Sequence, residues 1–354
     1  MNVDVPPLDS RAMEAMRAEL DRKTKPRGSL GRLEELAVQL AGIGVADPRF
    51  AVLVAAADHG YSEERVSAYP REVTGQMLRV FASGGAAICV LARSVGAELV
   101  VVDAGVLDAP TIDGVRSEIV DGVRGTEDFT FGRAMSRPTA IGAIERGIAL
   151  ADGLADDGIG IVGIGEMGIG NTTSASALAA ALLIVEPVRV SGSGAGLDDA
   201  GIARKVDAVH RGLAANGLPR RDADPLDVLA AVGGLEVAFL VGVCLGAACR
   251  RVAIVLDGFI TGAAALVASR MQPLATGSMI AATRSPEPGH ALVLDSLGLE
   301  PLLDLRLRLG EGTGAALALP LVRSAVAIVT EMATFESAGV SGPAETDAAL
   351  VADA

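Results

Sequence analysis

The chain has 354 residues, of which half are hydrophobic, 3% are aromatic and none is Trp. Its core must therefore consist of Ala, Val, Leu and Ile, a composition that suits parallel sheets covered by Ala-rich helices. The formal net charge of −14 excludes a broad electrostatic surface for nucleic acid, because such a surface needs clustered Lys and Arg.

Neither a metal centre nor a membrane span is supported by the sequence. The three cysteines form no Cys-x-x-Cys pair and the three histidines lie far apart, so we expect reduced thiols and no metal. The mean hydropathy is +0.44, but the longest uncharged runs, such as 237–249 and 258–269, are shorter than the roughly 18 apolar residues that a span needs. The first residues, with Asp4, Asp9 and Arg11, lack the apolar region of a signal peptide. We therefore expect a cytoplasmic protein without a membrane role.

Two amphipathic helices are predicted at the start of the chain. The first covers 9–24, and the second follows a turn whose Ser29 can cap it. They form a small helical arm ahead of the main body. We expect a small helical domain at 1–45 and a large α/β domain at 46–310. The C-terminal helices at 311–354 are expected to join the small domain.

Buried strands alternate with apolar helices along the large domain. This alternation is typical of a doubly wound, mostly parallel, Rossmann-like α/β sheet. The strands are expected at 52–57, 99–102, 159–164, 252–256 and, as a short candidate, 277–282. The main helices are expected at 73–82, 86–94, 138–153, 173–183, 225–231, 237–248, 259–269, 290–297 and 315–331.

Polar residues at strand ends are the first candidates for a binding site. Open α/β sheets bind ligands at the carboxyl ends of their strands, and Asp58 and His59 directly follow the strand 52–57. A simple strand-end turn satisfied by Asp58 is the alternative. Residues 107–137 are irregular and too long for a simple crossover, so we expect a flap or an excursion toward a dimer partner.

The stretch 158–175, GIGIVGIGEMGIGNTTSA, is the most informative part of the chain. An apolar strand is expected to lead through a glycine turn into an Ala-rich helix. Asn171 or Thr172 can cap that helix, and its free amides favour an anion, most naturally phosphate. Glu166 places one carboxylate inside this turn.

Two other interpretations of this stretch stay open. The string Gly163-x-Gly165-x-x-Gly168 also matches the dinucleotide-binding fingerprint, although Glu166 would repel a diphosphate lying across the turn. Alternatively, the glycines serve only tight packing between strand and helix.

Later loops add further candidates. The glycine loop 192–199 precedes a helix that carries Lys205, a cation that suits a phosphate or a carboxylate. The loop 284–290 is made rigid by two prolines. Glu311 is a second glutamate between glycines, and it opens a long apolar helix.

Nine short motifs follow one another from about residue 25 to 340. They are KPRGSLG (25–31), ADHG (57–60), VSAYP (66–70), GGAAI (84–88), GEMGIGNTT (165–173), GAGLDD (194–199), DGF (257–259), EPGH (287–290) and GEGTGA (310–315). Each motif is weak alone, but nine in order are specific. Together they resemble the nicotinate-nucleotide:dimethylbenzimidazole phosphoribosyltransferases, the CobT family.

This resemblance implies an activity. The phosphoribosyl group of nicotinate mononucleotide would move to 5,6-dimethylbenzimidazole, giving α-ribazole 5′-phosphate and nicotinate in cobalamin lower-ligand synthesis, with inversion at the anomeric carbon. A homodimer without a metal or organic cofactor is also implied. Carried over by motif, the resemblance makes Glu311 the general base, with Ser67 and Gln76 in the base pocket. The candidate substrate-binding residues from strand ends, loops and resemblance together are Ser67, Gln76, Asp58, His59, Gly168, Asn171, Thr172, Lys205, Ser285, Gly289, His290 and Gly310.

The chemistry of the residues agrees with this activity. In nicotinate mononucleotide the nicotinate ring is a pyridinium, so its ring nitrogen becomes neutral when the ring departs. The attacking benzimidazole, in contrast, must lose a proton. A carboxylate in an apolar pocket can take that proton, because desolvation raises its pKa toward neutrality. We assign Glu311 as the base, and Glu166 as an auxiliary base or a stabiliser of positive charge at C1′. The competing hypotheses are a dinucleotide-dependent oxidoreductase and a non-catalytic nucleotide-binding protein.

Overall fold

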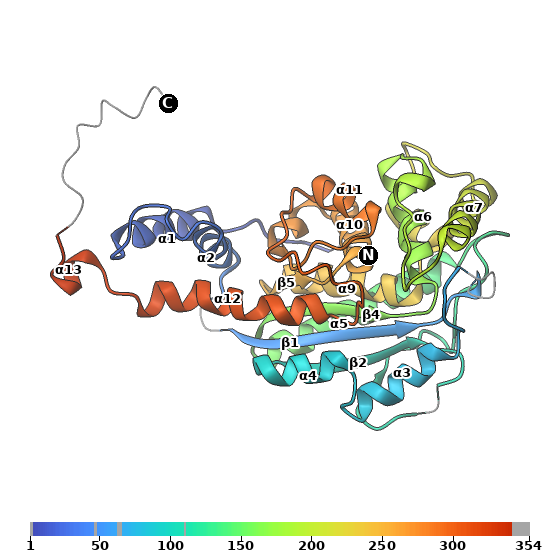
Figure 1. Cartoon of the computed structure of the whole chain (residues 1–354), viewed down its shortest axis with the longest axis horizontal. Coiled ribbons are helices and arrows are strands. Elements are labelled where there is room, and N and C mark those ends of the chain that lie inside the picture. Colours follow the sequence, from blue (N-terminus) through green and yellow to red (C-terminus); the bar gives the residue numbers. More distant parts are fainter. Residues whose placement is uncertain (1–2, 46–47, 62–65, 110, 342–354) are drawn as a thin grey trace.

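The computed structural model describes residues 3–45, 48–61, 66–109 and 111–341 (Figure 1). Its centre is a parallel sheet of six strands in the order β3-β2-β1-β4-β5-β6. The strands are β1 (Arg49–Ala57), β2 (Glu98–Gly105), β3 (Val115–Ser117), β4 (Ile159–Met167), β5 (Ala253–Leu256) and β6 (Met279–Ala281). The sheet winds outward in both directions from β1 and β4, which confirms the predicted doubly wound architecture.

Helices cover both faces of the sheet. The α-helices are α1 (Ser10–Arg22), α2 (Arg32–Ile43), α3 (Val73–Ala82), α4 (Ala87–Val95), α5 (Arg137–Asp156), α6 (Asn171–Leu183), α7 (Asp199–Ala215), α8 (Pro225–Val232), α9 (Leu235–Cys249), α10 (Phe259–Met271), α11 (Pro288–Leu297), α12 (Thr313–Glu331) and α13 (Phe335–Ala338). Side chains of β1 alternate between two cores, as strand geometry requires. Leu53 belongs to the core shared with α5, α6, α9 and α10, whereas Val52 and Val54 belong to the core shared with α3, α4 and α12.

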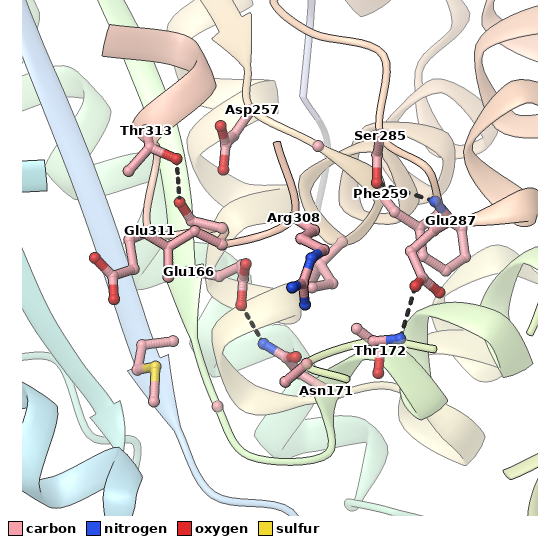
Figure 2. A pocket seen from close by; sticks show the side chains of 18 of the residues that line it. Glu166, Asn171, Thr172, Asp257, Phe259, Ser285, Glu287, Arg308, Glu311 and Thr313 are labelled. Carbon is pink, nitrogen blue, oxygen red and sulfur yellow. Dashed lines mark hydrogen bonds between the residues drawn. The ribbon is translucent and has the colours of Figure 1, made fainter. Parts of the chain in front are cut away.

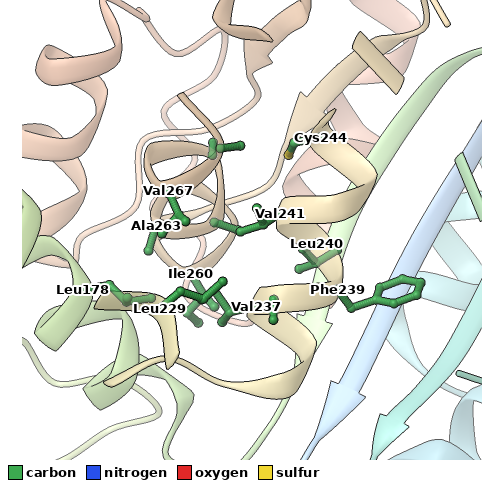
Figure 3. Packing of buried hydrophobic residues seen from close by; sticks show 14 of the residues in the cluster. Leu178, Leu229, Val237, Phe239, Leu240, Val241, Cys244, Ile260, Ala263 and Val267 are labelled. Carbon is green, nitrogen blue, oxygen red and sulfur yellow. The ribbon is translucent and has the colours of Figure 1, made fainter. Parts of the chain in front are cut away.

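The larger core consists mainly of Ala, Val, Leu and Ile side chains. Figure 3 shows Val237 and Val241 of α9 beside Ile260, Ala263 and Val267 of α10. On its other side α9 meets α5 almost backbone to backbone. A Cβ atom at Gly147 would lie 2.1 Å from Phe239 O, and one at Gly242 would lie 2.0 Å from Ile144 O. Small residues therefore allow a close helix packing that large side chains would prevent.

The described residues of the segment 107–137 are largely irregular, as expected, but the segment is also attached to the sheet, and its role as a flap or as an excursion toward a dimer partner stays a prediction. It contains the edge strand β3, which pairs in parallel with β2. Val120 packs against Gly142 of α5, and Arg124 Nη1 donates to Asp103 Oδ2 at 3.2 Å. The sequence pattern missed β3 because the strand has only three residues and is largely exposed.

The N-terminal helices form an arm together with the end of α12 (Figure 1). The first turn of α12 lies beside the sheet, and its later turns pack against α2. Lys23 Nζ donates to Met332 O at 2.9 Å, and Thr24 N donates to Ala333 O at 3.0 Å. Because α12 belongs to both the arm and the sheet core, the boundary at 310/311 stays a prediction. Helix α2 begins after Gly31 without a side-chain cap, so the predicted cap by Ser29 was wrong.

Two described stretches are long and apolar enough to cross a membrane by length and composition alone, Val73–Val95 and Thr313–Glu331. The first is divided into α3 and α4 by a turn, and the second is the helix that covers the sheet. Core helices pass the same test, so the finding is weak support for a membrane role.

Candidate active site

A cavity of about 320 Å³ opens beyond the carboxyl ends of β4 and β5. This is the edge at which doubly wound sheets bind ligands, next to the point where the strand order reverses. Six segments of the chain contribute to its lining. The lining residues are Tyr69, Val73, Met77, Glu166, Met167, Gly168, Ile169, Asn171, Thr172, Gly194, Ala195, Asp257, Gly258, Phe259, Ile260, Thr283, Ser285, Glu287, Leu307, Arg308, Leu309, Gly310, Glu311 and Thr313.

Glu166 and Glu311, which are 145 positions apart in the sequence, both line this cavity (Figure 2). Their approach depends on Gly165. A Cβ atom there would lie 2.1 Å from Gly312 N and 2.5 Å from Glu311 C, so only glycine lets the loop reach β4. Glu311 itself has φ 62°, between Gly310 and Gly312 at φ 80° each. A left-handed backbone at a non-glycine residue is strained, and such strain is concentrated at functional sites.

Asp257 is a third carboxylate in the cavity; the sequence placed it in the DGF motif (257–259) but did not indicate it as a site residue. It follows β5, and its oxygens accept from Gly312 N at 3.1 Å, Gly314 N at 2.6 Å and Ala315 N at 3.2 Å. It therefore binds the first turn of α12 from a distant strand and holds the Glu311 loop in place. Its position after a buried strand, like that of Asp58, was the available signal.

The three carboxyl groups share a buried site, and all three have raised pKa values. Glu166 is 6% exposed, and Asp257 and Glu311 are 5% exposed each. Burial, with the charge of Asp257 as the next cause, raises the pKa of Glu166 to about 8 and that of Glu311 to about 7. Burial also raises the pKa of Asp257, to about 6, although its backbone donors lower it. The site is therefore poised to hold or release a proton near neutral pH.

Asn171 does not cap α6 as predicted. The N-cap is Gly170, at φ 96° and without a side-chain bond. Asn171 Nδ2 instead donates to Glu166 Oε2, a bond drawn in Figure 2. The first turn of α6 thus presents an amide to the carboxylate, and its backbone N–H groups remain directed toward the cavity end of the helix.

A second part of the cavity is polar and contains an arginine. Arg308 is exposed and points into the cavity in Figure 2. Lys205 is fully buried and donates to Thr172 Oγ1 at 2.9 Å and to Gly192 O at 3.0 Å, so it supports the wall from behind. Burial lowers the pKa of Lys205 to about 8. Glu287 Oε1 accepts from Gly194 N at 2.7 Å and fixes the loop on the same side.

Several predicted residues do not line the cavity. Ser67 is half-buried, and its Oγ accepts from Tyr69 N at 3.3 Å. Gln76 faces a separate cavity of about 200 Å³ that Asp58 also lines. His59 is fully buried behind the glycine turn. Direct contact of these four with substrate remains a prediction that the cavity does not support.

Of the predicted loop 284–290, only part lines the cavity. Ser285 lines it. His290 Nδ1 accepts from Ser285 N at 3.0 Å, and burial lowers the pKa of His290 to about 4, so its ring is neutral. Gly289 lies where a Cβ would be 2.6 Å from the Phe259 ring. Both residues therefore shape the wall and do not line it.

The apolar part of the lining was also missed. Tyr69, Val73, Met77 and Met167 surround it. Val73 and Met77 are separated by four positions on α3, so they share the face that meets the cavity. Gln76 lies beside Met77 in sequence but is rotated away by about 100°.

The glycine string does not form a dinucleotide-binding turn. Gly163 and Gly165 lie within β4, and a Cβ atom at Gly163 would be 3.1 Å from Ala315 Cβ. Both serve the close packing of α12 and its preceding loop on the sheet. Among the residues that the structure describes, no cluster of three or more His, Cys, Asp or Glu side chains is arranged to hold a metal ion.

The fold and the cavity define a class: a doubly wound α/β protein with a nucleotide-sized site at the switch point of its sheet. Comparisons with known proteins narrow this class. The DBI_PRT family model, described as a phosphoribosyltransferase, matches residues 5–340. A relative from Chloroflexus aggregans, named nicotinate-nucleotide–dimethylbenzimidazole phosphoribosyltransferase, is 52% identical over 340 residues, which cover 95% of each chain.

Two further comparisons agree. The relative of the same name from Salinispora tropica is 48% identical over 353 residues, covering 95% of this chain and 96% of its own length. The crystal structure of CobT from Thermus thermophilus is 42% identical, with a TM-score of 0.88, and covers 94% of this chain and 100% of that one. The chain therefore belongs to the family of nicotinate-nucleotide–dimethylbenzimidazole phosphoribosyltransferases.

Proposed function

We propose that this protein transfers the phosphoribosyl group of nicotinate mononucleotide to 5,6-dimethylbenzimidazole, as an enzyme of cobalamin lower-ligand synthesis. The observation that carries the proposal, beside family membership, is the group of three buried carboxylates around one cavity. Two of them have pKa values raised to about 7 and about 8. The reaction needs a base that works at neutral pH and negative charge near a cationic sugar carbon, and this group offers both.

Glu311 is the general base of the proposed reaction. A benzimidazole ring nitrogen attacks C1′ from the face opposite to nicotinate, and the C1′–N bond to nicotinate breaks. Its electron pair stays on the nicotinate nitrogen, which becomes neutral. The N–H proton of the benzimidazole passes to the Glu311 carboxylate. Because the pKa of Glu311 is raised to about 7, a substantial fraction is ionised at neutral pH and ready to accept the proton.

Glu166 and Asp257 stabilise the positive charge that develops on the sugar. A pyridinium nucleotide or an oxocarbenium-like transition state attracts both carboxylates and relieves their mutual repulsion. Binding of the cationic substrate should therefore favour the ionised form of Glu166. Asn171 holds one of its oxygens, which limits the movement of the charge.

The 5′-phosphate is proposed to bind where three features meet: the first turn of α6 with Thr172, the loop at Gly194, and Arg308. Helix N-termini attract phosphate through their free N–H groups, and Arg308 adds a positive charge. Ser285 lines the same cavity and offers a hydroxyl. Lys205 contributes indirectly, through its bond to Thr172.

The dimethylbenzimidazole ring is proposed to lie against the apolar wall of Tyr69, Val73, Met77 and Met167. Aliphatic and thioether side chains suit a methylated arene, and Met adapts its shape to different rings. Ser67 and Gln76 would act at most from the edge of this pocket.

We also propose a homodimer in the cytoplasm. The family resemblance supports the dimer, and an apolar groove of about 310 Å³ between α1, α2 and α12, lined by buried and half-buried hydrophobic side chains, is a candidate contact surface. The three cysteines are free, which agrees with a reducing compartment.

The direct test incubates the protein with nicotinate mononucleotide and dimethylbenzimidazole and separates the products by chromatography. The proposal predicts equal amounts of nicotinate and α-ribazole 5′-phosphate, and neither product when one substrate is omitted. Substrate binding without products would instead support a non-catalytic nucleotide-binding protein. The oxidoreductase hypothesis is not favoured, because the first two glycines of its fingerprint, Gly163 and Gly165, lie inside β4 and not in a turn.

A further inference from the structure

A second polar cluster lies directly behind the cavity and has no part in the reaction described above. It consists of His59 after β1, Tyr61, and Glu236 in the first turn of α9, and all three residues are 0% exposed. Glu236 Oε1 lies 2.8 Å from His59 Nε2, and the Tyr61 hydroxyl lies 3.1 Å from His59 Nδ1. The same hydroxyl lies 3.2 Å from Gly170 O. The cluster thus connects α9 to the turn that begins α6.

The number of hydrogens limits how these bonds can run. A tyrosine hydroxyl has a single hydrogen, so Tyr61 cannot donate to both His59 Nδ1 and Gly170 O. If Tyr61 donates to Gly170 O, then His59 Nδ1 must carry a proton and donate to the hydroxyl oxygen. A second proton then lies between His59 Nε2 and Glu236, so His59 and Glu236 together have no net charge. In the opposite arrangement Tyr61 donates to His59 Nδ1, which has no proton. His59 and Glu236 together then have a charge of −1, and Gly170 O loses its hydrogen bond from Tyr61.

The surroundings favour the neutral arrangement. Three carboxyl groups from different segments interact electrostatically with the cluster: Glu166 of β4 with Glu236, Asp58 with His59, and Asp128 with Tyr61. An additional negative charge, fully buried among them, would be strongly disfavoured. His59 should therefore keep its Nδ1 proton.

We propose that Glu236, His59 and Tyr61 form a positioning relay, in which a proton on His59 Nδ1 makes Tyr61 donate to Gly170 O and so fixes the turn that presents Asn171 to Glu166. Gly170 is the left-handed N-cap of α6, and the next residue, Asn171, makes the bond to Glu166. The turn at 168–170 is closely packed against the residues beneath it.

The ring of His59 is packed under this turn. A Cβ atom at Gly168 would lie 3.3 Å from His59 Nε2 and 2.7 Å from Ala57 O. The apolar wall proposed for the base comes largely from Tyr69 and α3 instead. The relay should therefore affect the transfer step more than the binding of dimethylbenzimidazole. In this respect it rests on the proposed function of Glu166.

The protonation of His59 can be measured without turnover. NMR spectra of the full-length protein with ¹⁵N-labelled histidine distinguish a protonated from a bare ring nitrogen, and His59→Gln identifies the His59 signals among the three histidines. We expect Nδ1 to be protonated under the conditions of the activity assay. A bare Nδ1 in the wild-type protein would overturn the relay, whether or not the enzyme shows the proposed activity.

The kinetic test uses Tyr61→Phe, which removes the hydroxyl and keeps the ring. We expect kcat to fall about tenfold, because a lost positioning bond misplaces reacting groups, while KM for dimethylbenzimidazole changes by less than about twofold. The matched control is Phe129→Leu, whose ring centroid lies 4.3 Å from that of Tyr61. It should lower Tm but leave kcat and the His59 signals unchanged. Wild-type kcat in Tyr61→Phe, or an equal loss in Phe129→Leu with unchanged His59 signals, would contradict the relay.

Discussion

Glu166, Asp257 and Glu311 come from β4, the end of β5 and the loop before α12, and the fold buries them around one cavity. Such a group is unfavourable for the folded protein alone, since each charge is desolvated and near another. The same arrangement suits a cationic substrate, which supplies the missing positive charge. We therefore interpret the raised pKa values of Glu166 and Glu311 as the result of burial and of the neighbouring carboxylate charge, which a cationic substrate would offset.

Replacing Glu311, the proposed base, with an uncharged residue of the same shape tests this interpretation. Glu311→Gln should reduce kcat/KM at least about a hundredfold, since a positioned base contributes roughly 10²–10⁴ in rate. In the wild-type enzyme kcat/KM should rise with pH through about 7, because the ionised form of Glu311 is the active one. This rise should disappear in Glu311→Gln. The control is Glu145→Gln, on an exposed position of α5. Wild-type turnover in Glu311→Gln would remove Glu311 from the base role.

The free energy of unfolding should also depend on pH, because ionising a buried carboxylate is unfavourable. The pKa of Glu166 is about 8 in the folded protein against 4.5 as its ordinary value, so the folded state binds more protons between these pH values. The contribution of Glu166 to stability is therefore fully present below pH 4.5 and is lost as the pH rises toward 8.

Glu166→Gln, which cannot ionise, avoids this loss. We expect the variant to exceed the wild-type protein in free energy of unfolding by on the order of 2–4 kcal/mol at pH 8, and by much less at pH 5. Urea unfolding at the two pH values measures the difference. A difference that stays constant with pH would show that Glu166 ionises as easily in the folded protein as in the unfolded chain.

At the scale of elements, the contact between β4 and the loop before α12 determines whether a site exists. Gly165→Ala places a methyl group 2.1 Å from Gly312 N, a backbone atom that cannot rotate away. We expect the loop to move, activity to fall at least about a hundredfold, and stability to drop by roughly 1–3 kcal/mol from overpacking.

The matched control for this variant is Gly153→Ala, in α5, where a Cβ atom meets nothing within 4 Å. It should raise stability by up to about 1 kcal/mol, since Ala is the better helix former, and leave activity unchanged. Thermal unfolding and the product assay measure both effects. A fully active Gly165→Ala would mean that the close approach of the loop is unnecessary for Glu311.

Most elements of the fold could be predicted from the sequence because their signals are local. Apolar runs and Ala-rich stretches predicted β1, β4 and the helices that flank them. The short edge strand β3 has no such run. The role of Asn171 was misjudged because a cap is a local preference, whereas its bond to Glu166 depends on how the turn is folded.

The site was predictable only in part. Glu166 and Glu311 were found through their glycine-flanked motifs and the family resemblance. Asp257 belongs to the DGF motif (257–259), but neither the motif nor its strand end indicated a role at the site, because its approach to the Glu311 loop is set by the packing of α12. On α3, the sequence favoured Gln76, whereas the helix turns Met77 toward the cavity. Which face of a helix meets a cavity is a property of tertiary packing.

At the scale of the whole molecule, α12 connects the site to the helical arm. Its first turn is held by Asp257, and its later turns pack against α2. The helical arm and the Glu311 loop are therefore connected through a single helix, which contains Pro320 in its interior. The apolar groove between α1, α2 and α12 lies on this arm, so a dimer contact there would restrain the same helix.

The crystal structure of the Glu311→Gln variant with nicotinate mononucleotide and dimethylbenzimidazole tests the central claim most directly, because the variant should bind both substrates without consuming them. We predict that C1′ of the mononucleotide lies between position 311 and the carboxylate of Glu166, with the 5′-phosphate at the first turn of α6 near Arg308. The base should rest against Met77 with a ring nitrogen facing position 311. A mononucleotide bound elsewhere, or a base whose nitrogens face away from residue 311, would contradict the proposed mechanism.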